Sequence, residues 1–174
     1  MPFRSSSADR LPMQTRLVSY EALTPTQCRQ LETLQIAPEQ IQFSGDIHTA
    51  LNTLLVNPSA DIAGFVFLVD EVPKGFFMLK RGDCLPHWAL EDATATLHAL
   101  QIDRREQGKG LGKVCLKALP AALSLKWPDI QQLMLSVDAD NAAAIGLYVG
   151  QGWIDAGEAY RGRIGFERRL VLKL

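Results

Sequence analysis

The segment Arg105-Glu-Gln-Gly-Lys-Gly-Leu-Gly112 constrains the fold of this chain more than any other, because it places glycines at alternate positions 108, 110 and 112. A strand-like run, residues 95–103, leads into it, and a run with helical periodicity, residues 113–125, follows. Glycine tolerates positive φ angles and lets a ligand approach the backbone. A helix N-terminus adds unpaired N–H groups and the positive end of a dipole. The segment therefore predicts a strand, a glycine-rich turn and a helix that together bind an anion such as phosphate.

Three kinds of phosphate-binding loop compete for this segment. A P-loop needs Ser or Thr after its Gly-Lys pair, but Gly110 follows Lys109. A dinucleotide-binding loop needs a third glycine where this chain has Lys113. The third pattern, Gln/Arg-x-x-Gly-x-Gly/Ala, is met by Arg105, Gly108 and Gly110. The spacing favours this third loop, with a glycine-rich surface loop as the alternative.

A second motif lies one predicted helix and one predicted strand further along the chain. Asn141, Ala144, Ile145 and Tyr148 are spaced i, i+3, i+4 and i+7, which places them on one face of a helix. Asp140 or Asn141 suits the N-cap, and Gly150 or Gly152 suits the end of that helix. A core helix with a buried tyrosine is the alternative.

Together the two motifs resemble those of the GNAT superfamily of N-acetyltransferases. The first is similar to the pyrophosphate loop of that superfamily, and the second matches its pattern Asn-x-x-Ala-x-x-x-Tyr-x-x-x-Gly-aromatic. The resemblance implies an α/β fold: a single GNAT-like domain over residues 14–174, with a mixed central sheet of about seven strands, about four flanking helices, and strands splayed at the cofactor cleft. A weaker likeness, over Gln107-Gly-Lys-Gly-Leu-Gly-Lys113, is to bacterial diamine and polyamine acetyltransferases.

The resemblance also implies acetyl-CoA as cosubstrate and indicates the residues that bind it. In the family the loop amides take the diphosphate, and the strand before the loop pairs with the amide-bearing arm as if with an added strand. Asn141 is expected to order that arm or the strand beside it. The expected cofactor-binding residues are Leu100, Gln101, Ile102, Gln107, Gly108, Lys109, Gly110, Leu111, Gly112 and Asn141.

Acetyl transfer to an amine needs an unprotonated amine, a polarised carbonyl and a proton for the departing thiolate. The resemblance implies direct attack, with Tyr148 as general acid. Many family members carry a glutamate early in the strand before the loop, where this chain has Thr96. His98 is a candidate general base, because it lies two residues from Leu100, on the same face of a regular strand, and histidine has an ordinary pKa of about 6.5. A water chain to bulk solvent is the alternative.

The sequence does not identify the amine that accepts the acetyl group. Asp83, Glu91 and Asp92 precede the cofactor strand and could draw a cationic amine toward the site, although a solvated loop also explains them. We expect a small amine, a polyamine or a peptide amine as acceptor. The alternative function is a non-catalytic module that senses acyl-CoA, and the placed acid Tyr148 favours the enzyme.

Composition narrows the remaining classes. A chain of 174 residues with a net charge of −1 is typical of one globular domain, and it argues against a nucleic-acid binder. No apolar run approaches the roughly 20 residues of a membrane helix. Residues 1–13 are polar and are expected to form a disordered extension. Cys84 and His87 lack a second ligand pair, so no metal is expected, and Cys115 fits a helix core. Three cysteines without a pairing pattern favour the reducing cytoplasm. We expect the protein to be a monomer or a homodimer.

Hydrophobic periodicity and turn residues predict the remaining elements. Expected strands cover residues 15–20, 62–69, 74–80, 93–103, 131–138, 153–160 and 164–173. Expected helices run from Pro25 to a break at Ala37-Pro38 and over residues 46–56, 113–125 and 141–150.

Overall fold

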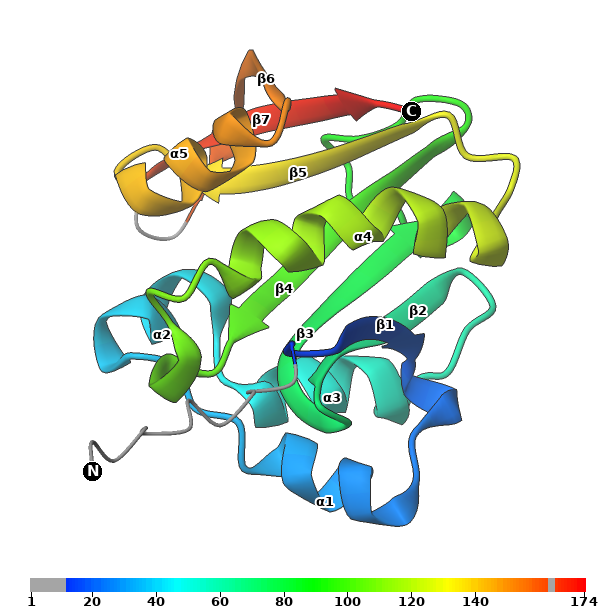
Figure 1. The fold of residues 1–174 in the computed structure, drawn as a ribbon. Coiled ribbons are helices and arrows are strands. Elements are labelled where there is room, and N and C mark those ends of the chain that lie inside the picture. The colour runs from blue at the N-terminus through cyan, green and yellow to red at the C-terminus, as the bar shows by residue number, and fades with distance from the viewer. Residues whose placement is uncertain (1–11, 163–164) are drawn as a thin grey trace, which may run out of the picture.

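One mixed sheet organises the computed structural model, which describes residues 12–162 and 165–174 (Figure 1). In these residues the sheet has seven strands in the order β1-β2-β3-β4-β5-β7-β6, and only the β4–β5 pair is parallel. The strands are β1 (Thr15–Ser19), β2 (Ile62–Val69), β3 (Val72–Arg81), β4 (Thr94–Ile102), β5 (Gln132–Asp138), β6 (Ile154–Arg161) and β7 (Phe166–Lys173). The predicted mixed α/β sheet is confirmed.

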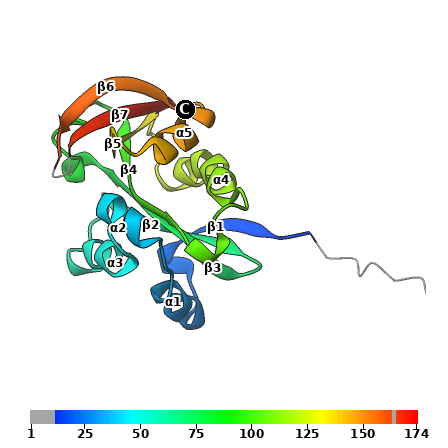
Figure 2. The same cartoon turned by 90° about the vertical axis from the view of Figure 1, so that its left-hand side faces the viewer.

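Helices cover both faces of this sheet. They are α1 (Pro25–Glu32), α2 (Pro38–Ser44), α3 (Ile47–Val56), α4 (Leu111–Lys126) and α5 (Ala142–Gly150). Figure 2 shows α4 and α5 on one face and α1, α2 and α3 on the other. The sequence did not predict α2. Its Pro38, interpreted as a break, instead occupies the first turn, where proline is well tolerated because that N–H needs no partner.

Two hydrophobic clusters hold the layers together. On one face, Leu119 of α4 packs with Leu135 of β5, and on the other, Leu31 of α1 packs with Phe76 of β3. Cys115 of α4 is fully buried in the first cluster, and burial raises the pKa of its thiol to about 12. It remains a protonated core residue, as predicted.

Strands β4 and β5 separate after a short ladder. In the described residues they pair only at Thr94–Gln132, Ala95–Leu133 and Thr96–Met134. Beyond these pairs, β4 continues to Ile102 and β5 to Asp138. The gap between them confirms the expected splayed strands.

A bulge at Ala99 interrupts β4. Ala99 has a φ angle of 56°, and the pairing of β4 with β3 shifts between Phe76 and Met78. One inserted residue reverses the alternation of side chains beyond it. Leu100 therefore packs in the cluster under α4, whereas His98 pairs with Met78 of the opposite cluster. The prediction that His98 and Leu100 share a face is wrong.

Of two predicted hairpin turns, one is shorter than predicted and the other extends outside the described residues. The β2–β3 hairpin turns over Asp70 and Glu71, with φ angles of 47° and 68°, so it is shorter than the predicted turn over residues 70–73. The predicted turn over residues 161–163 extends outside the described residues. The expectation of an N-terminal extension also falls largely outside them, because description begins at residue 12.

Candidate active site

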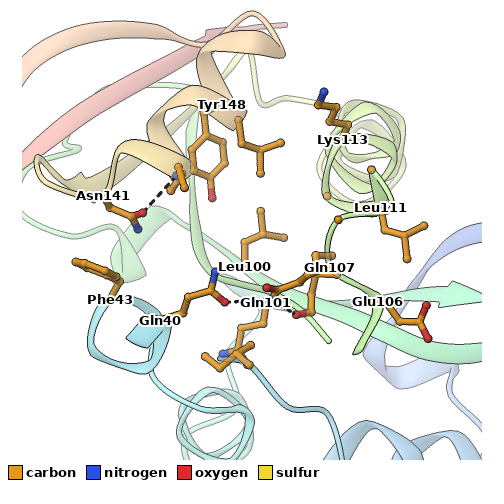
Figure 3. Close-up of a pocket in the computed structure, with 18 residues that line it drawn as sticks. Gln40, Phe43, Leu100, Gln101, Glu106, Gln107, Leu111, Lys113, Asn141 and Tyr148 are labelled. Atoms are coloured by element: carbon orange, nitrogen blue, oxygen red, sulfur yellow. Dashed lines mark hydrogen bonds between the residues drawn. The ribbon is translucent and has the colours of Figure 1, made fainter. Parts of the chain in front are cut away.

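A cavity of about 330 Å³ lies where the glycine loop, the end of β4 and the start of α5 meet (Figure 3). Phe43 and Gln40 of α2 close another side of it. The expected cofactor-binding residues that line it are Leu100, Gln101, Ile102, Gln107, Gly108, Gly110, Leu111, Gly112 and Asn141. The structure thus brings together the two sequence motifs, and Lys109 is the expected residue that does not line the cavity.

The glycine loop presents its backbone to open space. Gly108 and Gly110 have φ angles of 82° and 76°, and apart from each glycine and its two chain neighbours no described residue has an atom within 4 Å of a Cβ built there. Gly110 directly precedes Leu111, the first residue of α4. The first N–H groups of a helix have no intrahelical acceptors, so this end of α4 can hold an anion. The side chain of Leu111 is buried in the core, which leaves its backbone for the loop.

Ion pairs hold most basic side chains of the loop. Lys109 Nζ lies 2.7 Å from Glu106 Oε2, and Lys74 Nζ lies 3.4 Å from Glu106 Oε1. Arg105 donates twice to Asp103, at 2.9 and 2.6 Å. Lys113 lines the cavity and makes no ion pair with any described residue. Among these basic residues, Lys113 of α4 is the one that lines the cavity.

A second cavity of about 250 Å³ occupies the gap between β4 and β5. The residues that line both cavities are Phe43, Leu100, Asn141, Ala144 and Tyr148. The polar residues that line only the second are His98, Ser136, Asp138, Tyr160 and Glu167. The two cavities therefore meet between α5, Leu100 of β4 and Phe43 of α2.

Tyr148 lies at this junction. Its side chain points from α5 into the cavity (Figure 3), and its ring packs edge-on against Trp153, with ring centroids 5.5 Å apart. Burial raises the pKa of its hydroxyl, so the proton stays on the oxygen at neutral pH. Asn141 positions the same helix, because its Oδ1 accepts a hydrogen bond from the Ala144 N–H at 3.3 Å. This arrangement places a protonated hydroxyl of a capped helix at the junction.

His98 lines the second cavity as a neutral imidazole. Burial, with a smaller effect of the charge of Lys80, lowers its pKa to about 3. Its Nε2 lies 2.6 Å from Thr96 Oγ1, so the ring already has a hydrogen-bond partner. At neutral pH this histidine is a weak proton acceptor.

The acidic residues before β4 lie away from both cavities. Glu91 accepts a hydrogen bond from Gln132 Nε2 at 2.6 Å, at the first pair of the β4–β5 ladder. The gap opens at the other end of β4, and Asp83, Glu91 and Asp92 line neither cavity. These positions do not support the interpretation that Asp83, Glu91 and Asp92 draw a cationic amine toward the site.

Sequence reasoning missed the carboxylates that do line the gap. Asp138 of β5 pairs with Glu167 of β7, so long-range strand pairing brings them together. No local pattern marks either residue. Within residues 12–162 and 165–174, no three His, Cys, Asp or Glu residues form a possible metal site, and no helix is long and apolar enough to cross a membrane.

Known proteins resemble this chain in sequence and in fold. The chain is 31% identical over 101 residues to an uncharacterized N-acetyltransferase, YbbJ, of Bacillus subtilis (strain 168), which covers 58% of this chain and 63% of that protein. It is 36% identical over 105 residues to a mycothiol acetyltransferase of Renibacterium salmoninarum, which covers 59% of this chain and 30% of that protein. The matches therefore span less than two thirds of either relative.

A solved structure matches across almost the whole fold. The spermidine N-acetyltransferase of Vibrio cholerae, in complex with CoA and spermine, superposes with a TM-score of 0.65 at 18% identity, and covers 92% of this chain and 95% of that one. The sequence model of the acetyltransferase (GNAT) family matches residues 28–153, which contain both motifs and the end of α5. The chain belongs to the acetyltransferase (GNAT) family.

Proposed function

We propose that the protein is an acetyl-CoA-dependent N-acetyltransferase. The observation that carries the proposal is the position of Tyr148, which lines both the cavity at the glycine loop and the cavity in the β4–β5 gap. An enzyme that joins two substrates needs two such spaces that meet at a proton donor. A module that only senses acyl-CoA needs neither the second space nor the donor.

The first cavity fits acetyl-CoA. The loop amides between Gln107 and Gly112 offer donors to the diphosphate, and β4 beyond Thr96 has no partner strand on the β5 side. The backbone edge of Leu100 to Ile102 suits the extended arm of the cosubstrate. The Ile102 carbonyl already accepts a hydrogen bond from Gln107 Nε2 at 3.0 Å, which ties the loop to this edge.

The proposed reaction is direct transfer without a covalent enzyme intermediate. An unprotonated amine in the second cavity attacks the thioester carbon, a C–N bond forms and the C–S bond breaks. Tyr148 donates its proton to the departing sulfur and is protonated again from solvent. The proton of the attacking amine leaves through water, because a histidine with a pKa of about 3 is a poor base.

We propose a primary amine as acceptor, with polyamines as the first compounds to test and peptide N-termini as the second. The fold is shared with a spermidine N-acetyltransferase and with a ribosomal-protein-S18-alanine N-acetyltransferase, so it supports testing both classes of amine. The proposal also places the protein in the cytoplasm, where acetyl-CoA and reduced cysteines are found.

Replacing Tyr148 with Phe tests the mechanism. We expect the kcat of Tyr148→Phe to fall about 10²–10⁴-fold, because the sulfur loses its proton donor, while acetyl-CoA affinity stays close to that of the parent. Thiol release from acetyl-CoA in the presence of an amine panel measures the rate. Tyr20→Phe, which removes a hydroxyl outside both cavities, is the control. Equal kcat in Tyr148→Phe and parent would exclude the acid role, and no turnover with any amine in the parent would favour the sensor.

A further inference from the structure

Two carboxylates face the second cavity without a cation. Asp138 is 5% exposed, and its Oδ1 accepts a hydrogen bond from the Asp140 N–H at 2.8 Å. Its Oδ2 and both oxygens of Glu167 have no hydrogen bond or ion pair with any described residue. Burial and the neighbouring charge of Asp138 raise the pKa of Glu167. Buried carboxylates usually have a positively charged partner. Asp138 and Glu167 have no such partner among the described residues.

No other described residue of the cavity supplies that positive charge. The lining contains neither Lys nor Arg, and His98 is neutral. Arg169 pairs with Ser136 one step further along β5 and β7, but its Nη1 and Nη2 donate to the backbone oxygens of Trp88 and Glu158, at 3.4 and 3.5 Å. Among the described residues, the lining of the cavity therefore has carboxylates and no cation where its wall is formed by β5 and β7.

Asp138 and Glu167 lie away from the junction at Tyr148, where the proposed reaction takes place. Asp138 and Glu167 line only the second cavity, whereas Tyr148 lines both. A reacting nitrogen must reach the junction at Tyr148, so a charge held by the carboxylates belongs to another part of the same molecule. Tyr160, which also lines only this cavity, offers an aromatic ring to such a cation.

We infer that Asp138 and Glu167 form a subsite for a second, non-reacting ammonium group, and that they select acceptors with two amino groups over acceptors with one. This inference rests on the proposed acetyltransferase function. It assigns the acceptor class to a diamine or longer polyamine from the charge of the cavity. One amine of the acceptor lies at Tyr148, and the other lies between the two carboxylates.

Calorimetric titration of the CoA-loaded protein with 1,4-diaminobutane and with butylamine tests the subsite. The two probes share a carbon chain and differ by one ammonium group. We expect the diamine to bind the parent at least about tenfold more tightly, since a charge-assisted hydrogen bond in a buried site contributes that much or more. In acetylation assays, where the reacting nitrogen must lie at Tyr148, Glu167→Gln and Asp138→Asn should each lower kcat/KM about ten- to hundredfold for the diamine and much less for butylamine.

Glu158→Gln is the matched control, because Glu158 is an exposed carboxylate of β6 that lines neither cavity. Asp138→Asn keeps an oxygen for the Asp140 N–H, and thermal unfolding confirms that each variant is folded. Equal binding of the two amines to the parent, no diamine binding, or an equal loss of kcat/KM for both amines in the variants would overturn the subsite. Diamine-selective binding without acetylation would support the subsite and contradict the acetyltransferase, so the two failures are distinguishable.

Discussion

Single backbone angles decide whether the glycine loop can form. Gly110 has a φ angle of 76°, yet a Cβ there would meet no described residue within 4 Å other than its chain neighbours. Space in the unliganded loop is thus not the reason for glycine. The reason is the left-handed conformation, which costs an L-residue roughly 1–2 kcal/mol, together with the room that a phosphate needs beside the backbone.

Replacing Gly110 with Val should therefore weaken CoA binding by at least about tenfold and destabilise the fold by roughly 1–2 kcal/mol. Calorimetric titration with CoA and urea unfolding measure the two effects. Gly146→Ala is the matched control, because Gly146 also has open space around its Cβ position but lies in α5 with an ordinary φ angle. It should stabilise the protein by roughly 0.5–1 kcal/mol and keep CoA affinity. Unchanged CoA affinity in Gly110→Val would exclude the loop as the phosphate site.

In strand β4, the direction of the side chains depends on the bulge at Ala99. The bulge at Ala99 turns Leu100 toward α4 and leaves His98 on the other face. Without the inserted residue, the last residues of β4 would present their opposite faces to the two cavities. The bulge therefore determines which side chains of β4 meet the cofactor.

The positive φ angle of Ala99 gives a test of this bulge. Ala99→Gly should fold with stability close to that of the parent, since the removed strain and the added chain entropy are of similar size. Ala99→Val should be destabilised by roughly 1–3 kcal/mol, because a β-branched residue resists this conformation. Urea unfolding compares the three proteins. A Val variant as stable as the parent would mean that the backbone at Ala99 is not held in this conformation.

At the scale of the whole molecule, the sheet consists of two parts. Strands β1 to β4 form one part and β5 to β7 the other, and the β4–β5 ladder joins them at three pairs (Figure 1). Helices α4 and α5 pack in one cluster with strands of both parts. A ligand that occupies the first cavity contacts β4, α4 and α5 together, so its binding should hold the two parts in place.

Saturating CoA should accordingly raise the unfolding temperature. At a concentration 100 times its Kd, a ligand specific for the folded state adds about 2.7 kcal/mol. For a chain of this length that corresponds to a shift of roughly 5–10 °C. Differential scanning fluorimetry with and without CoA measures the shift, and Gly110→Val should show much less of it. The same shift in parent and variant would place CoA elsewhere.

The sequence predicted those parts of the molecule that depend on local pattern. The glycine loop, the helix capped by Asn141 and most strand limits follow from spacing and turn residues. Helix α2 did not, because the seven residues Pro38–Ser44 are too few to show a period. Ala99 carries no mark of its positive φ angle. The Asp138–Glu167 pair depends on the register between β5 and β7, which no local window contains.

The separation of β4 from β5 also affects the tendency of the protein to aggregate. A strand with an unpaired side invites another chain to extend the sheet, and proteins guard such sides with short strands, bulges or covering elements. Here the unpaired side of β4 lies in the interior of the sheet, beneath α4 and α5 and interrupted by the bulge at Ala99. A strand of a second protein therefore has less access to this side of β4 than it would have to an outer edge of the sheet. The molecule thus keeps a strand permanently ready to pair without becoming prone to aggregate through it.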